Sequence, residues 1–183
     1  MTTPSAEGAS AAARYISELM DSYPDYPKPG ILFRDLTRVL SDGPAFAAVV
    51  DELARSVADR DIDVIAGVEA RGFLLAAAVA YATGRGVLAV RKAGKLPGEV
   101  ISESYDLEYG SATLQLHAHR LAPGTSVLLV DDLLATGGTL AAAARLIERA
   151  GYAVEEIAVV LRLEGLGGPE ALAPRDVRCI VSV

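Results

Sequence analysis

Residues 127–139 read VLLVDDLLATGGT. The run Val127–Val130 is apolar throughout, which is typical of a strand covered on both faces of a parallel sheet. Asp131 and Asp132 follow directly, and the small residues of 135–139 lead into a helix predicted over 138–150. A strand, a polar turn and a helix in this order predict an α/β fold.

The same alternation extends in both directions along the chain. Apolar residues at helical spacing predict further helices at 12–22, 44–59 and 72–83. Asp42 is the expected cap of the second of these. Apolar runs predict further strands at 63–68, 87–91, 154–163 and 177–183. The expected architecture is a central, mostly parallel β-sheet flanked by helices.

Three segments break this alternation. Prolines fix the backbone and remove donors in residues 23–35, YPDYPKPGILFRD, which are therefore predicted to form an ordered loop. Residues 93–110 combine glycine, proline, serine and charge without core periodicity, as a lid over a site often does. The glycine-rich residues 165–174 are predicted to be a turn-rich connection.

Length and composition are those of one domain. A chain of 183 residues, of which 51% are hydrophobic, can bury one good core but is short for two. We expect a single domain over residues 11–183, preceded by a disordered tail over residues 1–10.

The composition also excludes several classes of protein. A net charge of −7 disfavours a general nucleic-acid or acidic-membrane surface, because such surfaces need an excess of Lys and Arg. The single cysteine, Cys179, excludes an internal disulfide. The residues before Arg14 lack the layout of a secretory signal, and no apolar run is long enough to span a bilayer. We expect a cytoplasmic protein that binds neither nucleic acid nor membranes.

Two patterns that would point to other chemistry lack the context they need. Residues 84–89 match G-x-G-x-x-A, but they follow a helix and enter a strand, the reverse of the order in dinucleotide-binding proteins. His117 and His119 are too few for a tetrahedral zinc site. They are predicted to share one face of a strand in a surface or packing role. No Walker-type phosphate loop is present.

The acidic pair and the residues after it predict a composite ligand site. Ligands of an open parallel sheet bind at the carboxyl ends of its strands, where Asp131 and Asp132 are expected. The free N–H groups that begin the following helix, together with the hydroxyls of Thr136 and Thr139, would donate to a phosphate. Carboxylates accept from hydroxyls, so ribose 5-phosphate fits both parts. The alternative is that both aspartates begin a solvated turn.

These residues resemble the signature of the type I phosphoribosyltransferases, and the LLATGGT ending is similar to the members that act on adenine. Further matching stretches occur in the family's order: PDYPKPGILFRDLT at 24–37, GVEARGF at 67–73, RKAGKLPG at 91–98 and SYDLEYG at 104–110. The resemblance covers about residues 15–183. It implies the type I phosphoribosyltransferase fold, with a flexible catalytic lid at about 93–110 and a small N-terminal hood.

The resemblance implies a reaction in purine salvage: adenine and phosphoribosyl pyrophosphate (PRPP) give AMP and pyrophosphate. Asp131 and Asp132 would hold the ribose. The 5-phosphate would be bound by Ala135, Thr136, Gly137, Gly138 and Thr139. Magnesium would arrive with PRPP, because the chain offers no dedicated cluster of metal ligands. A homodimer is implied as well.

Four cations lie where the ligands of the sheet are expected to bind: Arg71, Arg91, Lys92 and Lys95. A pyrophosphate leaving group would need such cations, although isolated surface cations are often simply solvated. The resemblance assigns these four to pyrophosphate and allows one of them to come from a dimer partner. It also implies a non-proline cis peptide between Glu69 and Ala70.

The remaining implied roles concern the base. Glu108 would exchange a proton with the purine ring as the catalytic acid/base, and a carboxyl closed into an apolar site can have the raised pKa this needs. Leu32, Phe33 and Arg34 would hold adenine. On sequence grounds alone, Glu108 could be an exposed glutamate, and residues 31–33 an apolar plug beneath the proline-rich loop.

Two other functions stay open at this point. A regulator that senses PRPP or purines would retain the acidic pair but lack the lid. A phosphoribosyltransferase for hypoxanthine, guanine or xanthine would differ in the direction of a few hydrogen bonds, which a sequence does not display.

Overall fold

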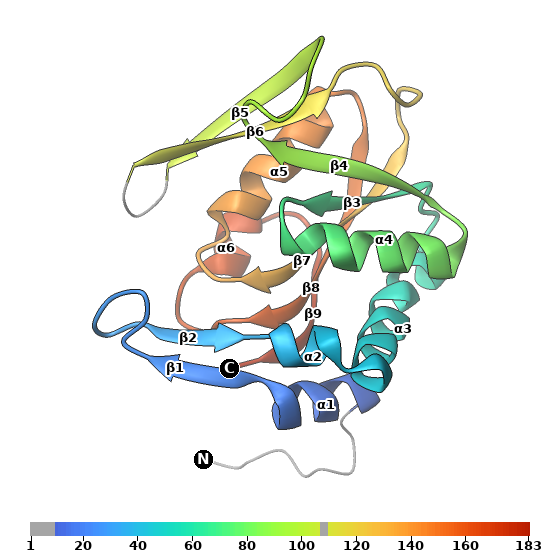
Figure 1. Cartoon of the computed structure of the whole chain (residues 1–183). Coiled ribbons are helices and arrows are strands. Elements are labelled where there is room, and N and C mark those ends of the chain that lie inside the picture. Colours follow the sequence, from blue (N-terminus) through green and yellow to red (C-terminus); the bar gives the residue numbers. More distant parts are fainter. Residues whose placement is uncertain (1–9, 107–109) are drawn as a thin grey trace. The chain divides into compact units, whose positions relative to one another are not determined.

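The computed structural model describes residues 10–106 and 110–183. The chain folds into two compact units, Met1–Glu52 and Leu53–Val183. Figure 1 labels the helices and strands of both units.

The first unit begins with helix α1, Ala11–Leu19. The Ser10 side chain caps it by accepting a hydrogen bond of 3.2 Å from the Ala13 amide. The helix predicted over 12–22 ends earlier than expected, because Asp21–Pro24 forms strand β1.

A hairpin replaces the loop predicted over 23–35. Strand β1 pairs antiparallel with β2, Leu32–Asp35, so both ends of that prediction are wrong. Pro24 is tolerated because it ends a strand of a two-stranded sheet, where no second neighbour needs its missing N–H. The Asp25 carboxylate accepts from the Gly30 amide at 2.7 Å and closes the connection.

Two helices follow the hairpin. The short α2, Thr37–Ser41, was not predicted, since five residues give no periodic pattern. Helix α3 spans Gly43–Asp59 and starts as predicted, with the Asp42 carboxylate accepting from the Ala45 amide at 2.9 Å.

The second unit contains a seven-stranded sheet in the order β5-β6-β4-β3-β7-β8-β9. Strands β4, β3, β7, β8 and β9 are parallel, whereas β6 is antiparallel to both β4 and β5. The predicted mostly parallel sheet is confirmed. The strands are β3 Val64–Val68, β4 Gly86–Lys92, β5 Val100–Asp106, β6 Ser111–His117, β7 Ser126–Leu134, β8 Ala153–Arg162 and β9 Val177–Ser182.

Helices cover both faces of this sheet, as the apolar strands require. Helix α4, Arg71–Thr83, packs on β3 and β7, while α5, Gly138–Arg149, packs on β5, β6 and β8. Figure 1 shows α4 in front of the sheet and α5 behind it. Ala66 belongs to the core cluster of α5, and the next residue, Gly67, faces Ala76 of α4.

The 93–110 segment, for which no strand was predicted, contains β5, which pairs with β6. Two other predicted features of this unit need correction. Strand β6 ends at His117, and His119 lies in the following turn with φ +53°, so the two histidines do not share a strand face. The connection predicted over 165–174 contains the short helix α6, Gly168–Leu172.

A network of charges joins the carboxyl end of α3 to β8 and β9. The Glu156 side chain is 4% exposed and lies 3.2 Å from Arg178 and 3.9 Å from Arg60. The two guanidinium groups also reach Asp59 at 2.9 Å and Asp176 at 2.7 Å. The charge of the buried Glu156 carboxylate is therefore compensated mainly by one arginine, Arg178.

Replacing Arg178 by Met is expected to lower the free energy of unfolding by about 2 kcal/mol, because it leaves the buried Glu156 with only the more distant Arg60. Urea denaturation measures the loss. The double variant Glu156→Gln/Arg178→Met should recover part of it, since the uncompensated charge is then gone. A double variant no more stable than the single would contradict this explanation.

Within residues 10–106 and 110–183, no helix has the length and apolar character needed to cross a membrane.

Candidate active site

The acidic pair lies at the carboxyl end of β7, but inside the strand. Pairing with β3 stops at Val130, whereas pairing with β8 continues from Asp131 to Leu134. The strand predicted at 127–130 was too short, because a sequence does not show how far a neighbouring strand extends. Asp131 and Asp132 therefore emerge beyond β3 while β8 still holds their backbone.

Arg71 and Gly72, at the start of α4, lie against the acidic pair. The Arg71 Nε lies 2.8 Å from Oδ2 of Asp132, whose side chain is 8% exposed. A Cβ atom on Gly72 would lie 2.8 Å from Asp131 Oδ1 and 3.0 Å from the Val130 carbonyl oxygen. The close approach of α4 to Asp131 thus requires glycine at position 72.

Burial perturbs both carboxyl groups. It raises the pKa of Asp131 to about 8; the negative charge of Asp132 adds to the rise, and Arg71 opposes it. Burial also raises the pKa of Asp132, again against the pull of Arg71. Two carboxylates share one guanidinium, so the pair is suited to a ligand that brings hydroxyl donors or positive charge.

A pocket of about 220 Å³ joins this pair to the start of α5. It is lined by Arg71 and residues 131–140. Gly137 has φ +84°, and no side chain caps the helix that follows, so its first N–H groups are left for a ligand. A bound anion is favoured there by the helix dipole as well.

The back of this loop packs against α6. A Cβ atom on Gly137 would lie 2.8 Å from the Gly168 carbonyl oxygen and 3.0 Å from Ala171 Cβ. Position 137 thus requires glycine both for its backbone conformation and for this close packing. The packing of Gly137 against α6 therefore fixes the backbone path of residues 135–139.

The predicted cations differ in how firmly they are held. Arg91 donates to Glu69 through Nε at 3.2 Å, and its guanidinium carbon lies 5.9 Å from the Phe73 ring centre. Hydrogen bonding from Arg91, and from the Lys92 amide at 3.0 Å, lowers the pKa of Glu69. Lys92 and Lys95 are exposed. The non-proline cis peptide expected between Glu69 and Ala70 is present.

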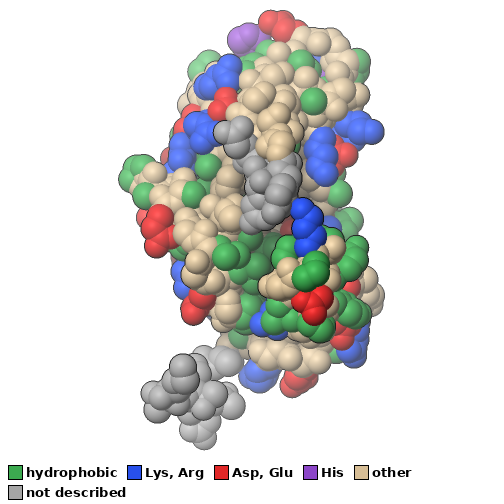
Figure 2. Space-filling model, turned by 90° about the vertical axis from the view of Figure 1, so that its left-hand side faces the viewer, with side chains coloured by type: hydrophobic (Ala, Val, Ile, Leu, Met, Phe, Trp, Pro, Cys, Tyr) green, Lys and Arg blue, Asp and Glu red, His purple; other side chains and the backbone are tan. Residues whose placement is uncertain are grey.

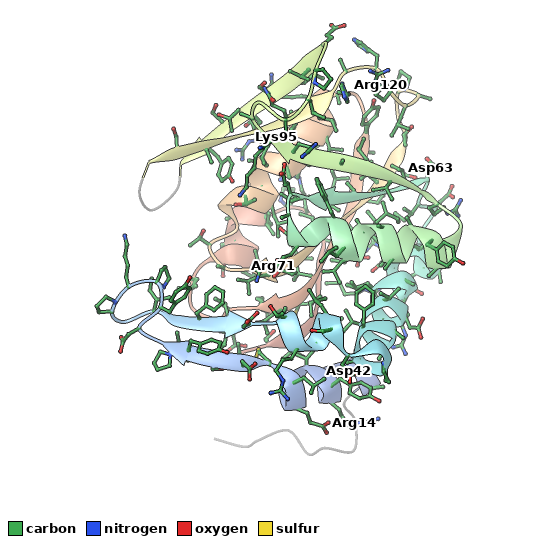
Figure 3. The ribbon with its side chains drawn as sticks, in the orientation of Figure 1. Arg14, Asp42, Asp63, Arg71, Lys95 and Arg120 are labelled. Carbon is green, nitrogen blue, oxygen red and sulfur yellow. The ribbon has the colours of Figure 1, made fainter. Side chains whose placement is uncertain are left out.

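Two of these cations, Arg71 and Lys95, are labelled in Figure 3 and lie on the side of the sheet where the parallel strands end. Asp63 lies on the opposite side. Figure 2 faces the side toward which β3, β4 and β7 run, and Lys and Arg side chains lie there among acidic ones. Cations and carboxylates are thus interspersed on this face.

The residues predicted to hold the base belong to the first unit. Leu32, Phe33 and Arg34 are consecutive in β2. The Phe33 ring meets Tyr26 edge to face, with ring centres 5.2 Å apart, and Arg34 donates to the Ser22 hydroxyl at 2.7 Å. The Leu32 side chain is half-exposed. A hollow in this unit is lined by Tyr23, Pro24, Asp25, Tyr26, Phe33 and Asp35.

Comparison with known proteins identifies the family. The phosphoribosyl transferase domain matches residues 38–181. The chain belongs to the phosphoribosyl transferase family. An adenine phosphoribosyltransferase of Clavibacter michiganensis is 63% identical over 172 residues, covering 94% of this chain and 97% of that protein.

Solved structures agree with this assignment. The adenine phosphoribosyltransferase of Thermoanaerobacter pseudethanolicus has a TM-score of 0.89 and 42% identity, covering 93% of this chain and 99% of that one. The Saccharomyces cerevisiae enzyme, solved with adenine and an imino-altritol bisphosphate, has a TM-score of 0.88 and 35% identity, with 93% and 99% covered. The type I phosphoribosyltransferase fold is thereby confirmed.

In this phosphoribosyltransferase the structure brings together Arg71, the acidic pair and residues 135–139, as the sequence predicted. Glu108, the predicted acid/base residue, lies outside the described residues. Three contacts were missed: Glu69 with Arg91, Gly72 with Asp131, and Tyr105 with Thr139. The last joins residues 34 apart, and no sequence pattern signals it.

The acidic pair, Asp131 and Asp132, is the part of the described site whose chemistry suits magnesium binding. The described part of the chain holds no group of three or more His, Cys, Asp or Glu side chains able to bind a metal ion. Magnesium commonly binds through one or two carboxylates together with substrate phosphates. Asp131 and Asp132 match that pattern in their ionised forms, when the substrate supplies the other oxygens.

Proposed function

We propose that this phosphoribosyltransferase transfers the 5-phosphoribosyl group of PRPP to adenine, giving AMP and pyrophosphate as a step of purine salvage. The observation that carries the proposal is one pocket in which the partly buried Asp131 and the buried Asp132 adjoin the uncapped start of α5. A ribose 5-phosphate unit presents both hydroxyls and an anion. The adenine phosphoribosyltransferases that are 63% and 57% identical to this chain support the choice of reaction.

Asp131 and Asp132 act on the ribose in this proposal. Departure of pyrophosphate leaves positive charge on the ring, and two nearby carboxylates stabilise that charge as it develops. They also accept hydrogen bonds from the ribose hydroxyls. Residues 135–139 hold the 5-phosphate and thereby aim C1′ at the base, which lowers the entropic part of the barrier.

The cations act on the leaving group. Arg71, Arg91, Lys92 and Lys95 bind pyrophosphate and neutralise its charge as the bond to C1′ breaks. Glu69 holds the Arg91 guanidinium in place for this role. Magnesium carried into the site on PRPP would supply further positive charge to the leaving group.

The other predicted residues hold the base and exchange a proton with it. Leu32, Phe33 and Arg34 bind adenine, and Glu108 accepts the proton that the imidazole ring loses as its nitrogen bonds to C1′. The lid over residues 93–110 excludes water, because a ribosyl cation open to solvent would hydrolyse.

We also infer a cytoplasmic homodimer. Leu74 and Tyr81 are seven residues apart on α4 and so lie on one face of the helix, with 55% and 91% exposure. Val87 of β4 is 48% exposed. A second copy of the chain is the proposed cover for this apolar surface. The lone cysteine suits a reducing compartment.

Turnover assays test the proposal directly. The purified protein is mixed with PRPP, magnesium and one of adenine, hypoxanthine, guanine or xanthine, and nucleotide and pyrophosphate are measured. We expect AMP from adenine alone, and at least a roughly 100-fold lower rate from the Asp131→Asn/Asp132→Asn variant. Binding of PRPP without turnover of any base would indicate a regulator, and a nucleotide formed from a 6-oxopurine would indicate a different base specificity.

A further inference from the structure

The hydroxyl of Thr139 has a partner outside the loop that binds the 5-phosphate. Its Oγ1 donates a hydrogen bond of 3.2 Å to the phenol oxygen of Tyr105, which comes from β5. Thr139 is the second residue of α5 and lines the pocket beside the acidic pair. The Tyr105 side chain is partly buried against the core cluster.

Other contacts hold β5 along α5 and therefore fix this pair of hydroxyls. Glu103, on the same face of β5 as Tyr105, lies 2.7 Å from Arg145 and 2.6 Å from Arg149. Arg149 also donates to the Ser102 carbonyl at 3.0 Å. Strand and helix run in opposite directions, so Tyr105 arrives at the start of α5, where the phosphate site lies.

The chemistry of the two hydroxyls sets the direction of the bond when a phosphate is bound. A hydroxyl has one proton to donate, and a phosphate oxygen only accepts. When Thr139 donates its proton to a bound phosphate, its bond to Tyr105 reverses relative to the structure, and Tyr105 becomes the donor. A phenol is a more acidic donor than an aliphatic hydroxyl, and accepting its proton strengthens the donation by Thr139.

We propose that Tyr105 is a positioning residue for the 5-phosphate: it donates to Thr139 Oγ1 and so orients the Thr139 proton toward the phosphate. The inference rests on the proposed function, because it takes the ligand at residues 135–139 to be the phosphate of PRPP. Tyr105 itself does not touch the substrate.

The variant Tyr105→Phe tests this inference, because it removes one hydroxyl and keeps the ring that packs on the core. We expect the Kd for ribose 5-phosphate and the KM for PRPP to rise about 5- to 10-fold, the effect of losing one hydrogen bond to a charged site. The KM for adenine, the inhibition constant of pyrophosphate and the Tm should stay unchanged, since none depends on the 5-phosphate.

Two further variants separate positioning from a general structural effect. Ser104→Ala removes a hydroxyl from the opposite face of β5, where Ser104 bonds Thr113 at 2.9 Å, and should leave the Kd for ribose 5-phosphate unchanged. In a Thr139→Val background, Tyr105→Phe should have no additional effect on that Kd, because the coupling partner is absent. Additive effects in this cycle would overturn the proposal.

The outcomes distinguish this inference from the proposed function. If wild-type protein forms AMP and Tyr105→Phe binds ribose 5-phosphate as tightly as wild type, the inference fails and the function stands. Equal losses for PRPP, adenine and pyrophosphate together with a lower Tm would also overturn it, because they would show a structural role. If wild-type protein neither binds ribose 5-phosphate nor forms AMP, both fail.

Discussion

Replacing Asp131 by Asn is expected to stabilise the ligand-free protein at pH 8 while lowering kcat/KM at least about 100-fold. The substitution keeps the shape of the side chain and removes a charge that lies beside Asp132. Under the proposed mechanism, activity falls because the ribose loses a negative partner for its developing charge. Stability rises because a buried carboxylate with too few cationic partners is no longer ionised.

The stabilisation should depend on pH in a defined direction. The pKa of Asp131 is raised from its usual value near 4 to about 8 in the folded state. The proton is therefore held more tightly by the folded chain. The stabilisation from protonated Asp131 is fully present below about pH 4 and is lost as pH rises toward about 8. Wild type should weaken over this window, whereas the Asp131→Asn variant has no charge to gain at this position.

Thermal unfolding between pH 4 and 9 without ligands measures the difference. The Tm of Asp131→Asn should match wild type near pH 4 and exceed it by roughly 4–8 °C at pH 8, if about 2 kcal/mol of destabilisation is removed. A constant offset at all pH values would show that the effect is not electrostatic. The kcat/KM values are measured on the same preparations.

Asp63 provides a control of opposite sign. Its carboxylate accepts from the Ser126 amide and hydroxyl, both at 2.9 Å, and the hydrogen bond from the amide is the main cause of its lowered pKa. A lowered pKa gives stability that is present above the unfolded pKa and lost as pH falls. Asp63→Asn should therefore lower the Tm at pH 7 without changing the KM for PRPP.

Such a trade-off between activity and stability would account for an acidic pair at this position. Residues that stabilise a transition state are often not those that stabilise the free protein. In this chain the pair is held by strong local features: pairing of β7 with β8, the Arg71 contact and the glycine at position 72. Without a ligand, these supply only part of the charge compensation that the partly buried Asp131 and the buried Asp132 need.

Periodicity predicted the parts of the fold that are buried on both faces. Strand β3 is apolar throughout, and β7 and β8 contain the apolar runs 127–130 and 157–161. Helices α3, α4 and α5 are rich in apolar residues as well. The hairpins were missed for a physical reason: β1 and β5 are largely polar, and their pairing is set by partners rather than by their own residues. Strong local sequence patterns therefore predicted the core strands and helices, whereas the polar strands β1 and β5 were not predicted.

The candidate site likewise has parts that the sequence predicted and contacts that it did not. Asp131, Asp132 and residues 135–139 are close in sequence, so their chemistry could be inferred from one stretch. Arg71 could be placed because it follows another strand of the same parallel sheet. The contacts of Glu69 with Arg91 and of Tyr105 with Thr139 depend on register and on helix packing, which only the folded structure specifies.

Replacing Gly137 by Ala is expected to raise the KM for PRPP at least about 30-fold, an estimate that assumes about 2 kcal/mol of lost phosphate binding. Its φ of +84° is strained for alanine, and the new Cβ would lie 2.8 Å from the Gly168 carbonyl oxygen. A backbone oxygen cannot move aside as a side chain does, so the loop itself must shift. The N–H groups of α5 would then no longer point at the 5-phosphate.

Gly124→Ala is the matched control for backbone strain. Gly124 has nearly the same φ, +81°, but an added Cβ would meet no atom within 4 Å. Both variants should lower the Tm, and only Gly137→Ala should raise the Kd for ribose 5-phosphate. If Gly137→Ala bound ribose 5-phosphate as wild type does, the packing of α6 behind residues 135–139 would have no part in phosphate binding. A selective loss would instead show that α6 fixes the loop from a position the substrate never touches.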